Sequence, residues 1–164
     1  MCFAAVYHAK DLDSKQPIAL KVVHKDNKKV SDMMHGEVEI MLKSGLHPNI
    51  VSLKDVFETD EEIILVQDEV AGGELFDWFA NQDSLPTEQQ ASNFVRSAAA
   101  ALYHLHSRKI IHNDLKPENL LLTLTYPPAL KVRPPPTPSV SNRGLHVGRV
   151  QLVARTDVML TTSV

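Results

Sequence analysis

Short apolar runs, a pattern typical of β-strands, dominate the first 70 residues of the chain. The runs cover residues 3–9, 18–23, 50–57 and 63–67. Polar segments at residues 13–17 and 58–62 predict a turn within each successive pair of strands. Between the two pairs, Ser31 can cap a helix that runs to about Ser44, where Gly45 and Pro48 end it.

That helix carries Val38, Met41 and Leu42 on one face. We therefore expect a small five-stranded sheet with one helix packed on one side of it. The predicted fold class of this part is α+β.

The middle of the chain changes to a helical pattern. Gly72 and Gly73 interrupt the strands, and a short helix is expected over residues 74–80. Thr87 and Gln90 have the spacing of a capping box that opens a long helix reaching about Ser107. Its apolar face is formed by residues spaced four, four and three apart, namely Phe94, Ala98, Leu102 and Leu105.

From Thr123 onward the composition differs again. Six of the ten prolines lie in this part, so residues 126–144 should be irregular, with a strand over 147–154 as a weaker expectation. We place one domain at residues 1–122 and a proline-rich, basic, disordered tail at 123–164.

Charge and cysteine content narrow the classes of partner. The chain has 164 residues and a net charge of -3, but the tail carries five bases and one acid, so residues 1–122 carry -7. Tyr126 is the only aromatic residue of the tail, which gives nucleic-acid stacking little support. No apolar stretch predicts a membrane span. Cys2 is the only cysteine, which is typical of a reducing compartment, the cytoplasm or nucleus.

The most informative motif is His112-Asn113-Asp114-Leu115-Lys116, followed three residues later by Asn119. It resembles the catalytic loop of protein kinases. The resemblance implies that Asp114 accepts the proton of the substrate hydroxyl, that Lys116 neutralises the γ-phosphate and that Asn119 binds Mg²⁺. His112 would be structural, and Asn113 stands where the family usually has an arginine.

A second match lies at residues 18–21, Ile-Ala-Leu-Lys, which resemble the third strand of the kinase small lobe. A lysine on the inward face of a strand needs a counter-charge, because burying an unpaired ammonium is costly. Glu37 is the expected partner of Lys21, with Glu39 as the alternative, and the pair would hold the phosphates of ATP. The other interpretation of Lys21 is a surface lysine at a strand end.

The resemblance also implies an adenine site. Residues 1–6 are similar to the end of the glycine-rich loop, and the last glycine of that loop is expected where the chain begins. Val6, Ala19 and Leu121 would then sandwich the adenine ring, unless they are only core residues.

Residues 68–77 resemble the hinge between the two kinase lobes, in the calcium/calmodulin-dependent group and its death-associated relatives. The resemblance implies that the Asp68 carbonyl and the Val70 amide bind the adenine edge and that Gln67 is the gatekeeper. Glu74 would contact ribose or a basic substrate residue, or would serve as a carboxylate at a helix N-terminus. The implied lobes are residues 1–67 and 74–122, with the hinge at 68–73.

One kinase motif is absent where it is expected. Residues 129–132 look like the strand that leads into Asp-Phe-Gly, but the sequence continues with Arg133-Pro134-Pro135-Pro136. The resemblance thus covers residues 3 to about 122, or to 132 if this strand is included. Losing one preorganised electrostatic group typically costs on the order of 10²–10³ in rate. We also expect an exposed apolar patch on the long helix, formed by Phe94, Leu102 and Leu105.

Together, the motifs identify the chain as similar to a truncated serine/threonine protein kinase domain that uses ATP and Mg²⁺. The acidic residues Glu74 and Glu118 suggest protein substrates with basic residues. We expect the activity to be impaired or absent. The alternatives are a non-catalytic nucleotide-binding or interaction module, and a fragment without function.

Overall fold

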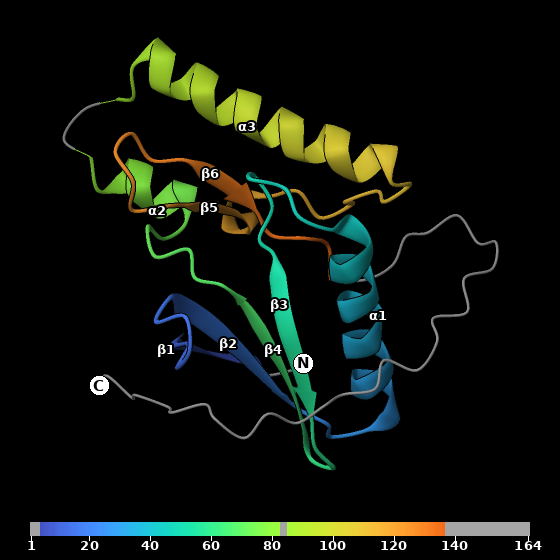
Figure 1. The fold of residues 1–164 in the computed structure, drawn as a ribbon. Helices are drawn as coiled ribbons and strands as arrows, with labels where there is room; N and C mark the ends of the chain where they lie inside the picture. Colours follow the sequence, from blue (N-terminus) through green and yellow to red (C-terminus); the bar gives the residue numbers. More distant parts are fainter. Residues whose placement is uncertain (1–3, 83–84, 137–164) are drawn as a thin grey trace.

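A computed structural model describes residues 4–82 and 85–136 of the chain. The first half is an antiparallel sheet with the strand order β1-β2-β4-β3 (Figure 1). Its strands are β1 (Ala4–Lys10), β2 (Pro17–His24), β3 (Leu53–Glu58) and β4 (Glu62–Asp68). Helix α1 (Lys28–Ser44) covers one face of this sheet, where its apolar residues pack against Val23, Val56, Ile63 and Leu65.

The fold is α+β as expected, but the described sheet has four strands and not five. The apolar runs of the sequence supply only four segments of strand type, and these four pair with one another. The position of α1 also differs from the sequence prediction. Asn27, not Ser31, is the N-cap, and its side chain accepts a hydrogen bond from the Val30 amide at 3.1 Å. Asparagine is as good a cap as serine, so the helix begins one turn earlier.

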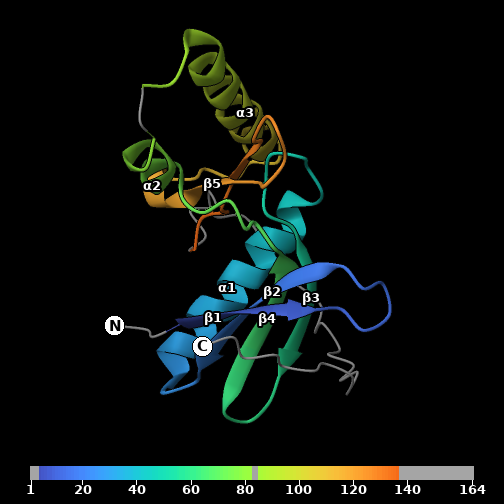
Figure 2. The same ribbon diagram turned by 90° about the vertical axis from the view of Figure 1, so that its left-hand side faces the viewer.

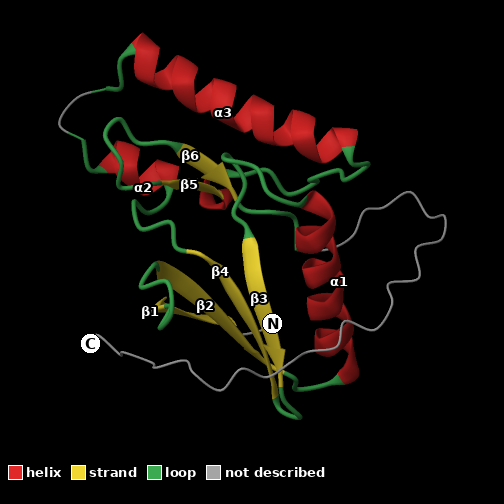
Figure 3. Cartoon of the chain, viewed as in Figure 1, coloured by secondary structure: helices red, strands yellow, loops and turns green. Residues whose placement is uncertain are grey.

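The second half contains α2 (Leu75–Ala80), α3 (Glu88–Ser107) and a 3₁₀ turn at Pro117–Asn119. A two-stranded sheet of β5 (Leu120–Leu122) and β6 (Leu130–Val132) follows. The predicted capping box of α3 forms between Thr87 and Gln90. Figures 2 and 3 show the two halves as separate lobes, with the chain crossing between them from β4 to α2.

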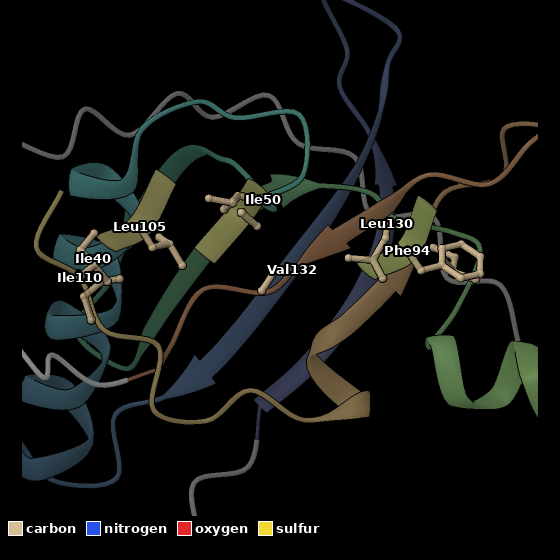
Figure 4. Packing of buried hydrophobic residues seen from close by; sticks show 9 residues of the cluster. Ile40, Ile50, Phe94, Leu105, Ile110, Leu130 and Val132 are labelled. Atoms are coloured by element: carbon tan, nitrogen blue, oxygen red, sulfur yellow. The ribbon is translucent and has the colours of Figure 1, made fainter. Parts of the chain in front are cut away.

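The prediction that Phe94, Leu102 and Leu105 form an exposed apolar patch on α3 is wrong for two of the three residues. Phe94 and Leu105 are 5% and 0% exposed, and Leu102 is half-buried. Phe94 and Leu105 are covered because they share one apolar cluster with Leu130 and Val132 of β6 (Figure 4). The buried members of that cluster are Ile40, Ile50, Phe94, Ala101, Leu105, Ile110, Leu122, Leu130 and Val132.

Strand β6 also joins the two lobes. The Val51 amide donates to the Val132 carbonyl at 3.0 Å, and the Val132 amide donates to the Asn49 carbonyl at 2.8 Å. Because residues 49–51 pair with β6, strand β3 begins at Leu53 and not at Ile50 as the apolar run suggested. The packed part of the chain therefore extends past Leu122 to at least Val132. The predicted strand over 147–154 lies outside the described residues.

No helix in the described ranges is long and apolar enough to cross a membrane.

Candidate active site

An ion pair between β2 and α1 forms one side of the candidate site. The Lys21 Nζ lies 2.6 Å and 2.8 Å from the two carboxylate oxygens of Glu37. The Glu37 side chain is 9% exposed and the Lys21 side chain 21% exposed. Since a buried carboxylate is stable only when it is paired, α1 is held with this face toward the sheet. Lys21 thus pairs with Glu37, and Glu39 is not its partner.

The residues expected around adenine come from both lobes. Val6 lies opposite Lys21 across β1 and β2, and Ala19 lies opposite Gln67 across β2 and β4. Val6 is exposed, Ala19 is half-buried, and Leu121 in β5 is buried. The Gln67 amide nitrogen contacts the Met41 sulfur at 3.2 Å, which fixes the end of this side chain against α1.

The hinge is joined to β5 through two glycines. The Gly72 amide donates to the Leu122 carbonyl at 2.8 Å, and the Leu122 amide donates to the Gly73 carbonyl at 2.9 Å. A Cβ atom at Gly72 would lie 2.4 Å from the Leu122 carbonyl oxygen, so only glycine fits there. An isolated bridge between Glu74 and Leu121 continues this pairing. Glu74 therefore lies beside β5, next to the expected adenine contact.

The side chain of Asp68 has a role that the sequence did not reveal. Its carboxylate lies 3.1 Å from Lys54 Nζ in β3 and 3.0 Å from Lys131 Nζ in β6, and it accepts from the Ser52 amide at 3.3 Å. Burial raises the pKa of Asp68, but the hydrogen bonds from Lys131 and Lys54 outweigh burial and hold the pKa below its ordinary value. Sequence reasoning assigned this residue only a backbone contact with adenine, as it did Val70, which is half-buried in the hinge.

The three expected catalytic residues lie together on the loop before β5. The Asn119 amide nitrogen donates to the Asp114 backbone carbonyl at 2.8 Å and to its Oδ2 at 3.1 Å. The Lys116 Nζ is 3.2 Å from the same Oδ2. Hydrogen bonds from Lys116 and Asn119 lower the pKa of Asp114, so it is a carboxylate at neutral pH. The preceding residue, Asn113, has a φ of 51°, a conformation that asparagine tolerates.

The residues that follow β6 are anchored to this loop. The Arg133 amide donates to the Asn119 carbonyl at 2.9 Å. The buried His112 lies with Nε2 at 2.8 Å from the Arg133 carbonyl, which can only accept, so Nε2 carries the hydrogen. His112 is therefore structural in position, as expected. Pro134 and Pro135, next along the chain, are both buried.

Magnesium does not fit the residues found here. Mg²⁺ prefers oxygen ligands, commonly one or two carboxylates together with the phosphates of a substrate. Asn119 and Asp114 are present, but residues 133–136 offer no carboxylate, and the Arg133 guanidinium lies 3.4 Å from the Glu118 backbone carbonyl. Within residues 4–82 and 85–136, no group of three or more His, Cys, Asp or Glu side chains could hold a metal ion.

The structure thus assembles the predicted residues in two groups. Lys21 and Glu37 form one group, and Asp114, Lys116 and Asn119 form the other. The hinge, with its pairing to β5, links the two lobes that carry them.

Comparison with known proteins places the sequence in a family. Residues 2–132 match the family model described as a protein kinase domain. The chain is 42% identical over 122 residues to myosin light chain kinase A of Dictyostelium discoideum, covering 73% of this chain and 41% of that protein. It is 41% identical over 125 residues to calcium/calmodulin-dependent protein kinase type IV of Homo sapiens, covering 76% and 25%.

A third relative, death-associated protein kinase 2 of Mus musculus, is 36% identical over 126 residues, covering 73% of this chain and 34% of that protein. The chain therefore spans less than half of the length of these three curated relatives.

Proposed function

The chain belongs to the protein kinase domain family, and we propose that it binds ATP between its two lobes while phosphoryl transfer is impaired. The observation that carries the first half is the closed Lys21–Glu37 pair. A lysine fixed in this way is a preorganised cation for phosphate oxygens. The hinge backbone at Asp68 and Val70 would bind the adenine edge, and Val6, Ala19 and Leu121 would contact its faces.

The inherited reaction is transfer of the γ-phosphoryl group of ATP to a serine or threonine hydroxyl of a protein. The bond from the hydroxyl oxygen to phosphorus forms, the bond from phosphorus to the ADP oxygen breaks, and the hydroxyl proton moves to Asp114. Lys116 would neutralise charge on the transferred group. Glu74 and the exposed Glu118 favour substrates with basic residues.

The proposed impairment rests on residues 133–136. In the family, ATP is used together with Mg²⁺, whose charge offsets that of the phosphates. This chain has buried prolines where a metal-binding carboxylate is expected, and the missing group alone typically costs on the order of 10²–10³ in rate. The intact Asp114, Lys116 and Asn119 group favours descent from an active kinase.

A second candidate function is an interaction module that does not use nucleotide. Val95 and Tyr103 favour it, because both are large apolar side chains exposed on α3, at 69% and 78%. Exposed apolar side chains mark a contact with another protein where they form a contiguous patch. For either function the single cysteine favours the cytoplasm or nucleus as the location.

Thermal unfolding of the full chain with and without ATP tests the proposal. Ligand binding stabilises the folded state by roughly 2.7 kcal/mol at a hundredfold excess over Kd, so ATP should raise the Tm. Lys21→Met should lose this shift, and Lys10→Met, which removes an exposed lysine of β1, should keep it. A cooperative melt that ATP does not shift would reject nucleotide binding and favour the interaction module. No cooperative melt would reject both functions.

A further inference from the structure

Building on the proposed ATP site, we infer that this chain binds ATP without magnesium, and that its own cationic side chains offset the phosphate charge. The inference concerns the ionic form of the ligand, since the proposed function leaves open whether free ATP or its magnesium complex is bound. It follows from three features of the loop and strand around Arg133.

The first feature is the way the oxygens of this region are already used. The Arg133 carbonyl accepts from His112, and the Asn119 carbonyl accepts from the Arg133 amide. The Oδ2 of Asp114 is in contact with both Lys116 and the Asn119 amide nitrogen. A magnesium ion bound to these oxygens would have to displace their donors, and it gives up its water ligands reluctantly; the side-chain oxygen of Asn119, the ligand that the resemblance implies, is not among them.

The second feature is that the proline segment is built into the packing. Val132, directly before it, is fully buried and is hydrogen-bonded to residues 49–51 through both its amide and its carbonyl. Pro134 and Pro135 are buried in turn. Because Val132 and Pro134 are both packed, the backbone on either side of Arg133 is fixed. The side chains of Pro134 and Pro135 therefore lie where an oxygen ligand for magnesium is expected.

The third feature is the sign of the local charge. Arg133 carries a guanidinium, and its Nη1 lies 3.4 Å from the backbone carbonyl of Glu118. Lys116 lies on the same loop, and its side chain is half-exposed. Together with Lys21, these side chains offer three cations to phosphate oxygens, of which Lys21 is paired with Glu37 and Lys116 with Asp114. Arg133 thus adds a cation next to the position where the family is expected to carry a metal-binding carboxylate.

The test is isothermal titration of the full chain with ATP, once in excess magnesium and once in EDTA. We expect the affinity in EDTA to equal or exceed that in magnesium. Binding that magnesium tightens by about tenfold or more would overturn the inference and leave the proposed ATP site standing. Heat of binding absent in both buffers would overturn both.

Two variants locate the cause. Pro134→Asp places a carboxylate beside Arg133 and should make ATP binding respond to magnesium by about tenfold. Pro136→Asp adds the same charge at an exposed proline of the same segment and should leave the magnesium response of the natural chain unchanged. If folded Pro134→Asp protein shows no magnesium response, the assignment to this position is wrong. If that variant fails to melt cooperatively, the comparison of buffers on the natural chain decides.

Discussion

The two sides of the candidate site are held by different kinds of interaction. On the small-lobe side, Lys21 and Glu37 are positioned by a direct pair of charged side chains. On the other side, Arg133 is held through its backbone, by His112 and Asn119. Backbone hydrogen bonds and apolar packing do not depend on which polar side chains a segment carries. The comparison shows how the frame around β6 can form although the metal-binding carboxylate is missing.

The largest expected effect on stability comes from the packing of α3 on β6 in the second lobe. Leu105→Ala should lower the free energy of unfolding by about 2–5 kcal/mol, because Leu105 is fully buried between α3 and β6. Tyr103→Ala, on the exposed side of the same helix, should change it by no more than about 0.5 kcal/mol. Urea titration of both variants gives the two values. Equal losses would mean that α3 does not pack on β6.

The next largest effect on stability is expected at the hinge glycines. Gly72→Ala should cost about 2–3 kcal/mol of unfolding free energy, because its Cβ would lie 2.4 Å from a backbone oxygen. Gly73→Ala should cost only about 1 kcal/mol, the strain of a φ of 77° with open space around the Cβ. Denaturant midpoints of the two variants make the comparison. A smaller loss for Gly72→Ala than for Gly73→Ala would contradict the described hinge.

The charged pair of the small lobe should matter less for stability and more for nucleotide. Glu37→Gln leaves Lys21 without its counter-charge and should cost about 1–2 kcal/mol, less than a fully buried pair because Lys21 is partly exposed. It should also weaken ATP binding in titration. Glu39→Gln removes the same charge from a half-buried position two residues away and should preserve both properties. Matching losses in the two variants would argue against the pair as the phosphate anchor.

The smallest effect is a change in pH dependence. Hydrogen bonds from Lys131 and Lys54 keep the pKa of Asp68 lowered in the folded chain. Its contribution to stability is therefore present at neutral pH and is lost as the pH falls below about 4. Asp68→Asn should be less stable than the natural chain at neutral pH, and the two should converge in acid. Asp60→Asn, in the exposed β3–β4 turn, serves as the control. The Tm of the natural chain and of Asp68→Asn is measured from neutral to acid pH. A Tm difference between them that does not shrink in acid would rule out this contribution.

Local signals in the sequence predicted the parts of the site that depend on neighbouring residues. Thr87 and Gln90 lie one helical turn apart, and their capping box forms. The cost of burying a lone charge predicted a carboxylate partner for Lys21, and the family resemblance favoured Glu37 over Glu39. Both predictions use the properties of a few residues and need no knowledge of the rest of the fold.

Contacts between distant segments were not accessible in this way. Nothing near Phe94 or Leu105 indicates that β6 will cover them, and nothing near Asp68 indicates that Lys131 will reach it. The burial of Pro134 and Pro135 is of the same kind, since prolines after a basic residue are typical of an exposed linker. All of these contacts join segments that are far apart in the sequence, so only the folded structure reveals them.

The central claim is that this chain keeps the ATP-binding half of a kinase site without an effective transfer half. The most direct measurement is transfer of labelled γ-phosphate from ATP to a serine peptide with basic residues, using protein whose ATP binding has been shown by titration. We predict that a chain that binds ATP transfers no more phosphate than its Asp114→Asn variant. Transfer by the natural chain that Asp114→Asn abolishes would contradict the account.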